Sequence, residues 1–378
     1  MTLARIFLLL LLTLACFPAF AADRAATERQ FSAWLSSTAW PAARATGVSE
    51  STFRRETAGL SLDWNLPGIV APGERPPEVN YQAEFKSPAD YFAEKYMAPV
   101  VRSGQGLMRE WSKTLASVET AYGVPASIIV AIWGRESGFG RVALPKDAVR
   151  TLATKAFMSD RPALFLDELV AALKILQDGH IQRAEMKSSW AGALGQPQFM
   201  PGKYLGFAVD FDGDGKRDIW RSVPDTLASI GYYLKAHGWQ PGARWGVEVE
   251  LPASVSCTLE GPEKPRPIAD WERDGVRPVS GGRLSEKKLG QTGYLMQPAG
   301  RHGPAFIVSW NFYVLKLYNE SDLYASFVGH AADRIAGRES GPFVTRWQAP
   351  SGFSRGAVRQ MQLRMESRGV DVGGADGL

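Results

Sequence analysis

The sequence contains little cysteine and little histidine. Its 378 residues include two cysteines and four histidines, His180, His237, His302 and His330. No two histidines lie four residues apart, as a zinc site on one helix would require, and their spacing suggests no Ser/His/Asp or Cys/His catalytic set. A disulfide-rich scaffold is excluded as well, so the fold must depend on its apolar core.

Long apolar runs are also missing, except at the N-terminus. Residues 1–21 have the organisation of a secretory signal peptide, with a short n-region ending at Arg5, an apolar stretch over 6–16, and the small-x-small sequence Ala19-Phe20-Ala21. The apolar stretch is shorter than the ~20 residues that span a bilayer as a helix, and no later segment qualifies. We therefore predict a cleaved signal peptide and an exported protein.

The positions of the two cysteines leave one alternative to simple export. Cys16 follows Leu-Thr-Leu-Ala, which allows lipidation and an outer-membrane lipoprotein, although Thr13 and Leu14 match the usual lipidation pattern poorly. Cleavage after Ala21 would leave Cys257 as the single cysteine of the mature chain. We then expect no internal disulfide, and a buried Cys257 that behaves as a small apolar residue.

A strong charge of one sign is absent too. The net charge is +4 and the isoelectric point is near 9.0, which suits an anionic partner such as cell wall, lipid headgroups or nucleic acid. No basic run marks a nucleic-acid site, and an exported protein rarely meets DNA. We predict no nucleic-acid partner.

What remains is an ordinary globular composition, with 45% hydrophobic and 22% charged residues in a chain long enough for two or three domains. Alternating residues at 247–251 and the apolar run 306–308 predict short strands, and a Pro- and Gly-rich stretch at 67–79 predicts an extended connection. Apolar residues at three- and four-residue spacing predict helices elsewhere. These helices are expected at 25–60, 89–122, 164–176, 224–237 and 312–336, with one more beginning at Pro125.

Glu136 occupies an apolar position in that last helix. At 100° per residue it shares one narrow stripe with Ile129, Ile132 and Trp133. A carboxyl group in apolar surroundings favours its neutral form, which is how a glycosidase keeps a general acid protonated. The alternatives are a structural glutamate paired with a neighbouring arginine, or one that lies in solvent beyond the end of the stripe.

A second group of candidate residues lies in the Gly- and Pro-rich segment 188–204. Its glycines allow the backbone to approach a ligand closely, and Ser189 and Gln198 offer hydrogen bonds. Three aromatic residues offer flat faces for a sugar ring, namely Trp190, Phe199 and Tyr204. This mixture is typical of carbohydrate recognition. The alternative is a structural loop whose aromatic residues belong to the core.

Four sequence blocks follow one another in order. They are Gly134-Arg-Glu-Ser-Gly-Phe-Gly-Arg141, Ser189-Trp-Ala-Gly-Ala-Leu-Gly-Gln-Pro-Gln-Phe-Met-Pro201, Val209-Asp-Phe-Asp-Gly-Asp-Gly215 and Lys235-Ala-His-Gly-Trp239. Together they resemble the lytic murein transglycosylase B family, glycoside hydrolase family 103, and the similarity runs over about 27–335. The resemblance implies a mainly α-helical, lysozyme-like catalytic region, with a small β-containing subdomain at about 245–310, in the periplasm.

The resemblance also implies an activity. Such enzymes are peptidoglycan lytic transglycosylases, which cleave the MurNAc-β-1,4-GlcNAc bond, leave 1,6-anhydromuramoyl ends and need no cofactor for catalysis. Glu136 matches the single catalytic residue, which acts first as general acid and then as base. The candidate substrate-binding residues are Ser189, Gln198 and Phe199, which match residues lining the family's sugar groove, together with Ser137 and Tyr204.

Two other functions remain open. A hydrolytic muramidase would use a second carboxylate ~5–9.5 Å from the first, and Asp147, Asp160 or Glu185 could supply it. A non-catalytic peptidoglycan-binding or scaffold protein would keep the groove without turnover. In every case we expect peptidoglycan glycan strands as the partner, with cell-wall synthesis or remodelling proteins as further candidates, and a monomeric chain.

The acidic stretch that begins at Asp210 starts like an EF-hand calcium loop. Acids occupy its first, third and fifth places and a glycine its sixth, but Arg221 stands at the twelfth, where a bidentate carboxylate is expected. The family resemblance implies a structural calcium in this loop. Its candidate ligands are Asp210, Asp212, Asp214 and Asp218, with Asp225 as a further source of oxygen. The alternative is an acidic turn that caps the next helix.

The C-terminal residues are predicted to be separate. After a linker at 336–350, residues 351–378 resemble the first half of a small helical peptidoglycan-binding module. Val358, Met361 and Met365 share one face of the expected helix. So short a segment buries too little surface for a core of its own, so we expect an incomplete, weakly ordered module.

Overall fold

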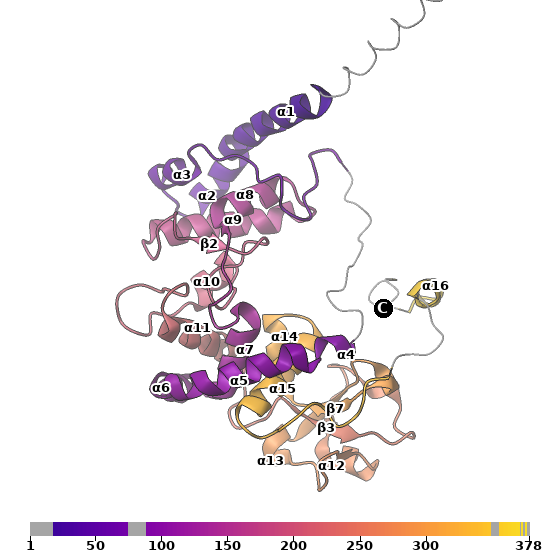
Figure 1. The fold of residues 1–378 in the computed structure, drawn as a ribbon. Coiled ribbons are helices and arrows are strands. Elements are labelled where there is room, and N and C mark those ends of the chain that lie inside the picture. Colours follow the sequence, from indigo (N-terminus) through magenta and orange to yellow (C-terminus); the bar gives the residue numbers. More distant parts are fainter. Residues whose placement is uncertain (1–17, 75–87, 349–354, 371, 373–374, 376–378) are drawn as a thin grey trace, which may run out of the picture. The chain divides into compact units, whose positions relative to one another are not determined.

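The structure, a computed structural model, describes residues 18–74, 88–348, 355–370, 372 and 375 (Figure 1). The chain divides into two compact units. Unit 1 comprises residues 1–78 and 140–226, and unit 2 comprises residues 79–139 and 227–378. Nearly all of the predicted signal peptide, Cys16, part of the 67–79 connection and part of the 351–378 segment lie outside the described residues, so these predictions remain as they stand.

Unit 1 is built mainly from helices. Helices α8 and α9 lie side by side at its centre, and α9 also packs against α2, α3 and α10 (Figure 1). Leu169 and Leu173 on α9 and Leu152 on α8 are fully buried between them. The elements are α1 (Pro18–Trp34), the π-helical turn η1 (Leu35–Ala39), α2 (Trp40–Ala45), α3 (Glu50–Thr57), β1 (Lys146–Asp147), α8 (Ala148–Phe157), α9 (Pro162–Gln177), β2 (Lys187–Ser188) and α10 (Pro201–Phe207).

Unit 2 combines a helical cluster with a small sheet. Helix α7 packs against α5 and α15 (Figure 1). Its helices are α4 (Pro88–Tyr91), α5 (Glu94–Glu110), α6 (Ser112–Tyr122), α7 (Ala126–Ser137), α12 (Ile268–Arg273), α13 (Glu286–Leu289), α14 (Trp310–Tyr318), α15 (Asp322–Ile335) and α16 (Arg355–Glu366), with 3₁₀ turns η2 (Cys257–Leu259) and η3 (Gly300–His302). Helix α11 (Val223–Ala236) crosses the boundary between the units.

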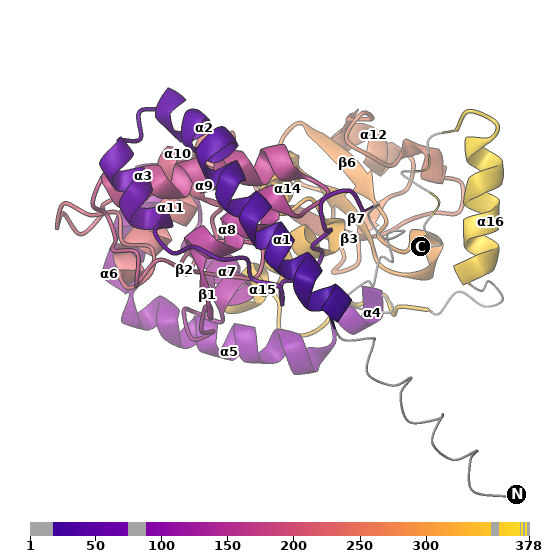
Figure 2. The ribbon, with the colours of Figure 1, turned by 90° about the horizontal axis from the view of Figure 1, so that it is seen from above.

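The sheet contains five antiparallel strands in the order β4-β6-β7-β3-β5. Figure 2 shows β3, β6 and β7 side by side, with α12 nearby. Apolar side chains pack beneath it around Trp271, Leu295 and Ile307, all of them fully buried. The strands are β3 (Gly246–Glu250), β4 (Arg266–Pro267), β5 (Arg277–Pro278), β6 (Thr292–Met296) and β7 (Ala305–Val308), within the segment for which a β-containing subdomain was predicted.

The predicted helical segments are present, but three of them are divided. The segment 25–60 forms α1, η1, α2 and α3, and the segment 89–122 forms α4, α5 and α6. The segment 312–336, predicted as one helix, forms α14 and α15, because Asn319 adopts an extended conformation and Ser321 caps a new helix. The prediction of a buried Cys257 is wrong. This residue is exposed in the turn η2, where Leu259 packs against the core instead.

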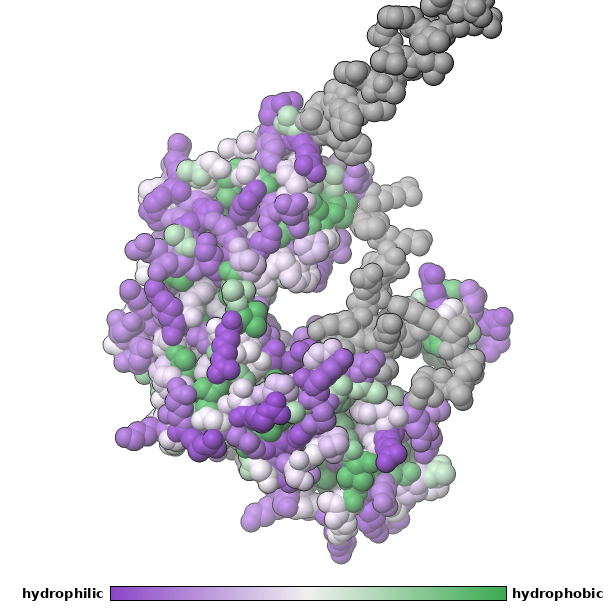
Figure 3. All heavy atoms as spheres, viewed as in Figure 1, coloured by the Kyte–Doolittle hydropathy of each residue, from purple (hydrophilic) through white to green (hydrophobic). Residues whose placement is uncertain are grey.

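The face drawn in Figure 3 is mainly polar. Hydrophilic side chains predominate on it, and hydrophobic ones form small separate patches.

No single helix among the described residues is long and apolar enough to cross a bilayer. The consecutive pair α6 and α7, bent by 110°, passes the same test of length and composition when the two are taken together. All but two of the twelve residues of α7 are buried within unit 2.

Residues 338–348, within the predicted linker, lie along unit 2 as a C-terminal strap. The ring of Phe343 packs against His330 of α15, with centroids 4.1 Å apart, and Trp347 stacks on Phe92 at 5.3 Å. The Glu248 carboxylate accepts hydrogen bonds from two backbone N–H groups of the strap, at 2.7 and 2.9 Å. Aromatic contacts and charge-assisted hydrogen bonds therefore hold the strap in place.

The burial of His330 beneath this strap predicts an acid-sensitive contribution to stability. Burial, followed by the positive charge of Arg334, lowers the pKa of His330 to about 4, while Asp333 and Glu94 act in the opposite direction. In the unfolded chain His330 takes up a proton near pH 6.5. In the folded chain it takes up that proton only near pH 4. Stability is therefore unaffected above pH 6.5 and falls as the pH drops towards 4, by about 3 kcal/mol in total.

We expect His330→Gln to remove this acid-dependent loss. The free energy of unfolding, measured with urea at about pH 7 and about pH 4.5, should fall less in the variant than in the original chain, by roughly 2 kcal/mol. His302→Gln, at an exposed histidine, serves as the control and should behave like the original. Equal acid sensitivity in all three proteins would contradict the assignment.

Candidate active site

Glu136 lies near the C-terminal end of α7, a helix of unit 2. Ten of the twelve helix residues are buried, and Arg135 and Glu136 are the two half-buried ones. Ile129, Ile132 and Trp133, which share the predicted stripe with Glu136, are at most 2% exposed. Because the helix is apolar nearly all round, it is a core helix, and its carboxylate emerges at the end of that core.

Tyr324 of α15 contacts this carboxylate directly. Its phenol oxygen donates a hydrogen bond to Glu136 Oε1 at 2.5 Å. The ring of Tyr318 from α14 stacks on the ring of Tyr324, with centroids 6.4 Å apart and planes 12° apart. Burial raises the pKa of both phenols well above the usual value, and the negative charge of Glu136 raises it further. Tyr324 therefore stays protonated and acts as a permanent donor towards Glu136.

Arg135, the neighbour of Glu136, is oriented by two aromatic rings. Its Nη2 donates to the Tyr91 hydroxyl at 2.9 Å, and the guanidinium lies 4.9 Å from the Tyr91 centroid and 5.4 Å from that of Phe327. Such cation–π contacts stabilise a partly buried charge. This positive charge acts on the Tyr324 phenol in the direction opposite to that of Glu136, so the site combines a carboxylate, a phenol donor and a nearby cation.

The chain leaves α7 through a strained turn. Gly138 ends the helix with φ +56°, and Phe139 follows with φ +65°, which is uncommon for an aromatic residue. The Phe139 ring folds back over Gly134, where a Cβ atom would lie 2.6 Å from it, and packs edge-on against Trp133. Glycine at position 134 is needed for this close approach, and the turn fixes the end of the helix that carries Glu136.

The segment 188–204 belongs to unit 1 and forms tight turns. Ser189 Oγ accepts hydrogen bonds from two backbone N–H groups of its own turn, at 3.1 and 3.3 Å. Gln198 has φ +53°, and its side chain donates to the Gly195 carbonyl at 2.7 Å. Gln198 and Phe139 are the two residues other than glycine with positive φ in the described chain. Each lies in one of the two main motif blocks, and such strain concentrates at functional sites.

Three of the predicted substrate-binding residues are buried. Phe199 and Tyr204 are fully buried, and the Tyr204 hydroxyl donates to a backbone carbonyl at 2.7 Å. The Ser137 hydroxyl donates to a backbone carbonyl of its own helix at 3.3 Å. Ser189 and Gln198 are partly exposed. The structure therefore gives the first three a packing role, and a contribution to sugar binding stays a prediction for all five.

The acidic loop brings three carboxylates together. Asp210, Asp212 and Asp214 each offer an oxygen within 4.8 Å of the others, and Gly215 at the sixth place has φ +89°. Asp225, fully buried in the first turn of α11, accepts three backbone N–H groups of the loop at 2.8–3.3 Å. Burial raises the pKa of Asp225, and these hydrogen bonds oppose the rise. Its carboxyl group therefore holds the loop in shape.

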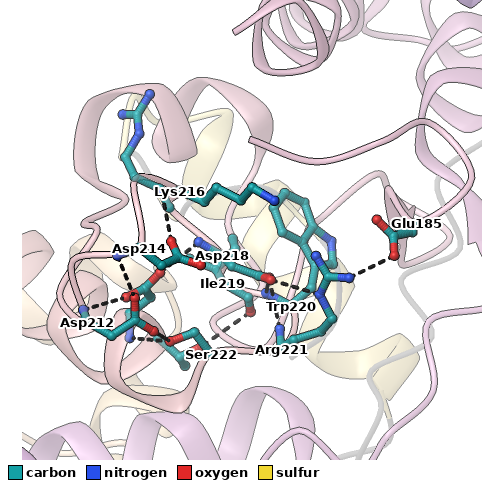
Figure 4. Close-up of polar contacts among 12 residues, drawn as sticks. Glu185, Asp212, Asp214, Lys216, Asp218, Ile219, Trp220, Arg221 and Ser222 are labelled. Atoms are coloured by element: carbon teal, nitrogen blue, oxygen red, sulfur yellow. Dashed lines mark hydrogen bonds and ion pairs between the residues drawn. The ribbon is translucent and has the colours of Figure 1, made fainter. Parts of the chain in front are cut away.

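Asp218 and Arg221 form an ion pair. Arg221 Nε contacts Asp218 Oδ2 at 2.8 Å, and its Nη1 contacts Glu185 at 2.7 Å. Figure 4 shows Arg221 extending towards Glu185 and away from Asp212. Asp218 also accepts two backbone N–H groups, at 3.0 and 3.1 Å, and does not belong to the three-carboxylate cluster. The donor set for a cation is thus three carboxylates, and Asp218 as a ligand stays a prediction.

The candidate second carboxylates for hydrolysis all lie in unit 1 and have cationic neighbours. Asp147 caps α8 and pairs with Arg183 at 3.0 Å. Glu185 pairs with Arg221, as described, and Asp160 has a longer contact of 4.0 Å with Arg161. Asp147 and Glu185 therefore have structural roles, Asp147 as a helix cap and both as partners of an arginine.

Tyr324 is the site residue that the sequence analysis missed. The Asn319-Glu320-Ser321-Asp322 sequence ends one helix and starts another, and Ser321 Oγ accepts the Tyr324 N–H at 3.4 Å. Serine followed by an acid is a helix-start signal that could have placed Tyr324 in a first turn. Nothing in the sequence pattern connects it with Glu136, which lies 188 residues earlier.

Known proteins resemble this chain in both sequence and structure. Escherichia coli (strain K12) membrane-bound lytic murein transglycosylase B is 31% identical over 261 residues, covering 65% of this chain. The chain spans 66% of the length of that relative.

Solved structures give the same picture. Pseudomonas aeruginosa SltB3 in complex with NAG-NAM-pentapeptide has a TM-score of 0.80 and 38% identity, covering 92% of this chain and 90% of SltB3. Its complex with NAG-anhNAM-pentapeptide gives 0.79. Escherichia coli lytic transglycosylase Slt35 in complex with calcium has a TM-score of 0.55 and 28% identity, covering 66% of this chain and 77% of Slt35.

These matches confirm the predicted fold class, a mainly α-helical, lysozyme-like protein with a small sheet subdomain. The family described as "Transglycosylase SLT domain" matches residues 30–333, which include all four sequence blocks and Tyr324. The chain therefore belongs to the transglycosylase SLT domain family.

Proposed function

We propose that this protein is a peptidoglycan lytic transglycosylase that cleaves the MurNAc-β-1,4-GlcNAc bond and leaves 1,6-anhydromuramoyl ends. The observation that carries the proposal is the half-buried Glu136 at the end of a core helix, bonded to the Tyr324 phenol. Membership of the transglycosylase family supports it. The anhydromuramoyl ligand in a related SltB3 structure agrees with the product.

In this mechanism Glu136 transfers two protons in turn. The carboxyl group first gives its proton to the glycosidic oxygen, the C1–O bond breaks, and the GlcNAc part leaves as an alcohol. The resulting carboxylate then takes the proton of the muramoyl C6 hydroxyl, whose oxygen forms a new bond to C1. Glu136 ends protonated again, no water is consumed, and one carboxyl group suffices, whereas hydrolysis by the usual route needs two.

The surroundings of Glu136 suit this double role. A general acid and base must alternate between neutral and charged forms, so neither form can be stabilised too strongly. The Tyr324 phenol bonds one oxygen of the carboxyl group, and the end of an apolar core helix covers part of the group. The phenol also fixes the direction in which the carboxyl group points. We propose Tyr324 as a positioning residue for Glu136.

Mass spectrometry of the soluble products tests the proposed function. Purified peptidoglycan incubated with the mature protein should release muropeptides with anhydromuramoyl ends. Reducing muramoyl ends would instead show hydrolysis by a muramidase with a second carboxylate. Binding of peptidoglycan with no soluble product would leave a non-catalytic wall-binding protein as the explanation.

We further propose that the protein acts in the periplasm after removal of residues 1–21. The proposal rests on the signal-peptide pattern and on the nature of the polymer substrate. Lipidation at Cys16 would place it on a membrane, as in the relative that is named membrane-bound. The mass of the protein purified from a membrane fraction and from a soluble fraction separates the two cases.

Calcium binding by the acidic loop is a further part of the proposal. Asp210, Asp212 and Asp214 gather three carboxylate oxygens within 4.8 Å, a donor set that suits a hard cation. The Slt35 structure holds calcium. Such an ion would neutralise the repulsion among the three carboxylates and stabilise the loop between α10 and α11.

Added calcium should therefore raise the melting temperature by several degrees, and a chelator should lower it. A ligand at a hundredfold excess over its dissociation constant stabilises the folded state by about 2.7 kcal/mol. Asp214→Asn should abolish the shift, because it removes one ligand charge at an exposed position. Asp160→Asn, an exposed acid of the same unit, should keep it. An unchanged melting temperature with calcium and with chelator would remove the ion from the proposal.

A further inference from the structure

Trp190 is the most exposed aromatic side chain among the described residues, with 55% of its surface accessible. It follows Ser189 in the 188–204 segment of unit 1. Its indole therefore offers a large accessible aromatic face.

The buried ammonium group of Lys155 contacts one face of the Trp190 indole. Lys155 of α8 is 4% exposed, and its Nζ lies 4.9 Å from the Trp190 centroid and 5.2 Å from that of Phe165. The same Nζ donates to the Pro67 carbonyl at 3.1 Å. One face of the indole is therefore occupied by a cation that is itself fixed by other groups.

A second contact seats the same turn on the same helix. Gly192 has φ +92°, and a Cβ atom there would lie 2.4 Å from Leu152 of α8. The backbone beside Trp190 thus packs directly on the helix that carries Lys155. An aromatic ring fixed both through its backbone and through one face loses little conformational freedom when a ligand covers the other face.

We propose that the outer face of Trp190 is a stacking platform for one N-acetylhexosamine ring of the glycan strand. A pyranose ring has an apolar face of C–H groups that covers a flat indole, and its amide and hydroxyl groups can reach polar groups at the edge. Ser189 and Gln198 supply such groups in the same segment. This inference rests on the proposed function, since it takes peptidoglycan as the substrate, and it adds a binding position contributed by unit 1.

Binding measurements without turnover test the platform. Chitohexaose, a soluble GlcNAc polymer without stem peptides, is titrated calorimetrically into protein carrying Glu136→Gln, and insoluble peptidoglycan is used in co-sedimentation. Added to that background, Trp190→Ala should weaken binding of both probes by about tenfold, and Trp190→Phe, which keeps a flat ring, by less than about threefold. Lys155→Met should give an intermediate loss, because it releases the ring but keeps the apolar stem.

Trp310→Ala is the matched control, since it removes an indole of similar exposure, 43%, from unit 2. It should bind both probes like its parent. In the active chain, Trp190→Ala should raise KM for peptidoglycan and leave kcat nearly unchanged. Parent-like binding by folded Trp190→Ala protein, or an equal loss in Trp310→Ala, overturns the platform. The proposed function fails separately, if the original chain releases no anhydromuropeptides.

Discussion

Glu136→Gln abolishes the release of anhydromuropeptides, with an expected loss of at least about 10³-fold in kcat. The amide has nearly the shape of the carboxyl group and its oxygen still accepts the Tyr324 hydrogen bond, so the site keeps its geometry. It can neither give a proton to the glycosidic oxygen nor take one from the C6 hydroxyl. Mass spectrometry of products from purified peptidoglycan measures the loss.

Glu119→Gln provides the matched control for this experiment. Glu119 is exposed and accepts the Ala126 N–H at the opposite end of α7, at 3.0 Å. The substitution removes the same charge from α6, the helix that precedes α7, and should leave activity unchanged. Retention of more than about a tenth of the activity by Glu136→Gln would exclude it as the general acid, because a lost proton donor costs far more than tenfold.

Tyr324→Phe should lower kcat by roughly 10- to 100-fold without unfolding the protein, because the carboxyl group loses the contact that orients it. The phenol stays protonated at all working pH values, since burial and the Glu136 charge raise its pKa. Without its hydrogen bond the Glu136 carboxyl group loses its fixed direction, so kcat should fall while KM for peptidoglycan stays nearly unchanged.

The split between kcat and KM distinguishes positioning from simple destabilisation. Tyr233→Phe removes another buried phenol hydroxyl of unit 2, one that donates to the Leu317 carbonyl at 2.5 Å. It should lower stability by about 1 kcal/mol and leave kcat nearly unchanged. A loss of kcat in Tyr324→Phe no larger than that in Tyr233→Phe would reduce Tyr324 to a packing residue.

The catalytic acid could be found from the sequence because its signal is local. A carboxylate one turn beyond Ile132 and Trp133, followed by Gly138, is visible within a dozen residues, and the structure places it at the end of a core helix. The spacing of the apolar residues nonetheless predicted one apolar face, whereas the helix is buried on nearly all sides. A short apolar run cannot show whether a helix is buried on one side or on all sides, since that depends on distant segments.

The rest of the site depends on contacts between distant segments. The stack of Tyr318 on Tyr324 and the hydrogen bond to Glu136 join elements that no short-range pattern connects. Burial of Phe199 and Tyr204 could not be foreseen either, because a Gly- and Pro-rich loop can turn its aromatic rings inward or outward with equal local cost. The helix α8 was missed because polar residues interrupt the apolar pattern of this short segment, which tertiary packing nevertheless buries.

The interleaving of the two units delays assembly of the catalytic centre. Unit 2 begins with residues 79–139 and is completed only by 227–378. The face of α7 that packs against α15 therefore stays uncovered until α15 has formed. Closing so long a loop is slow compared with forming local structure. A chain that is still being synthesised therefore carries Glu136 without Tyr324. In the proposed transglycosylase, the catalytic acid therefore gains its positioning residue only when residues 322–335 have formed α15.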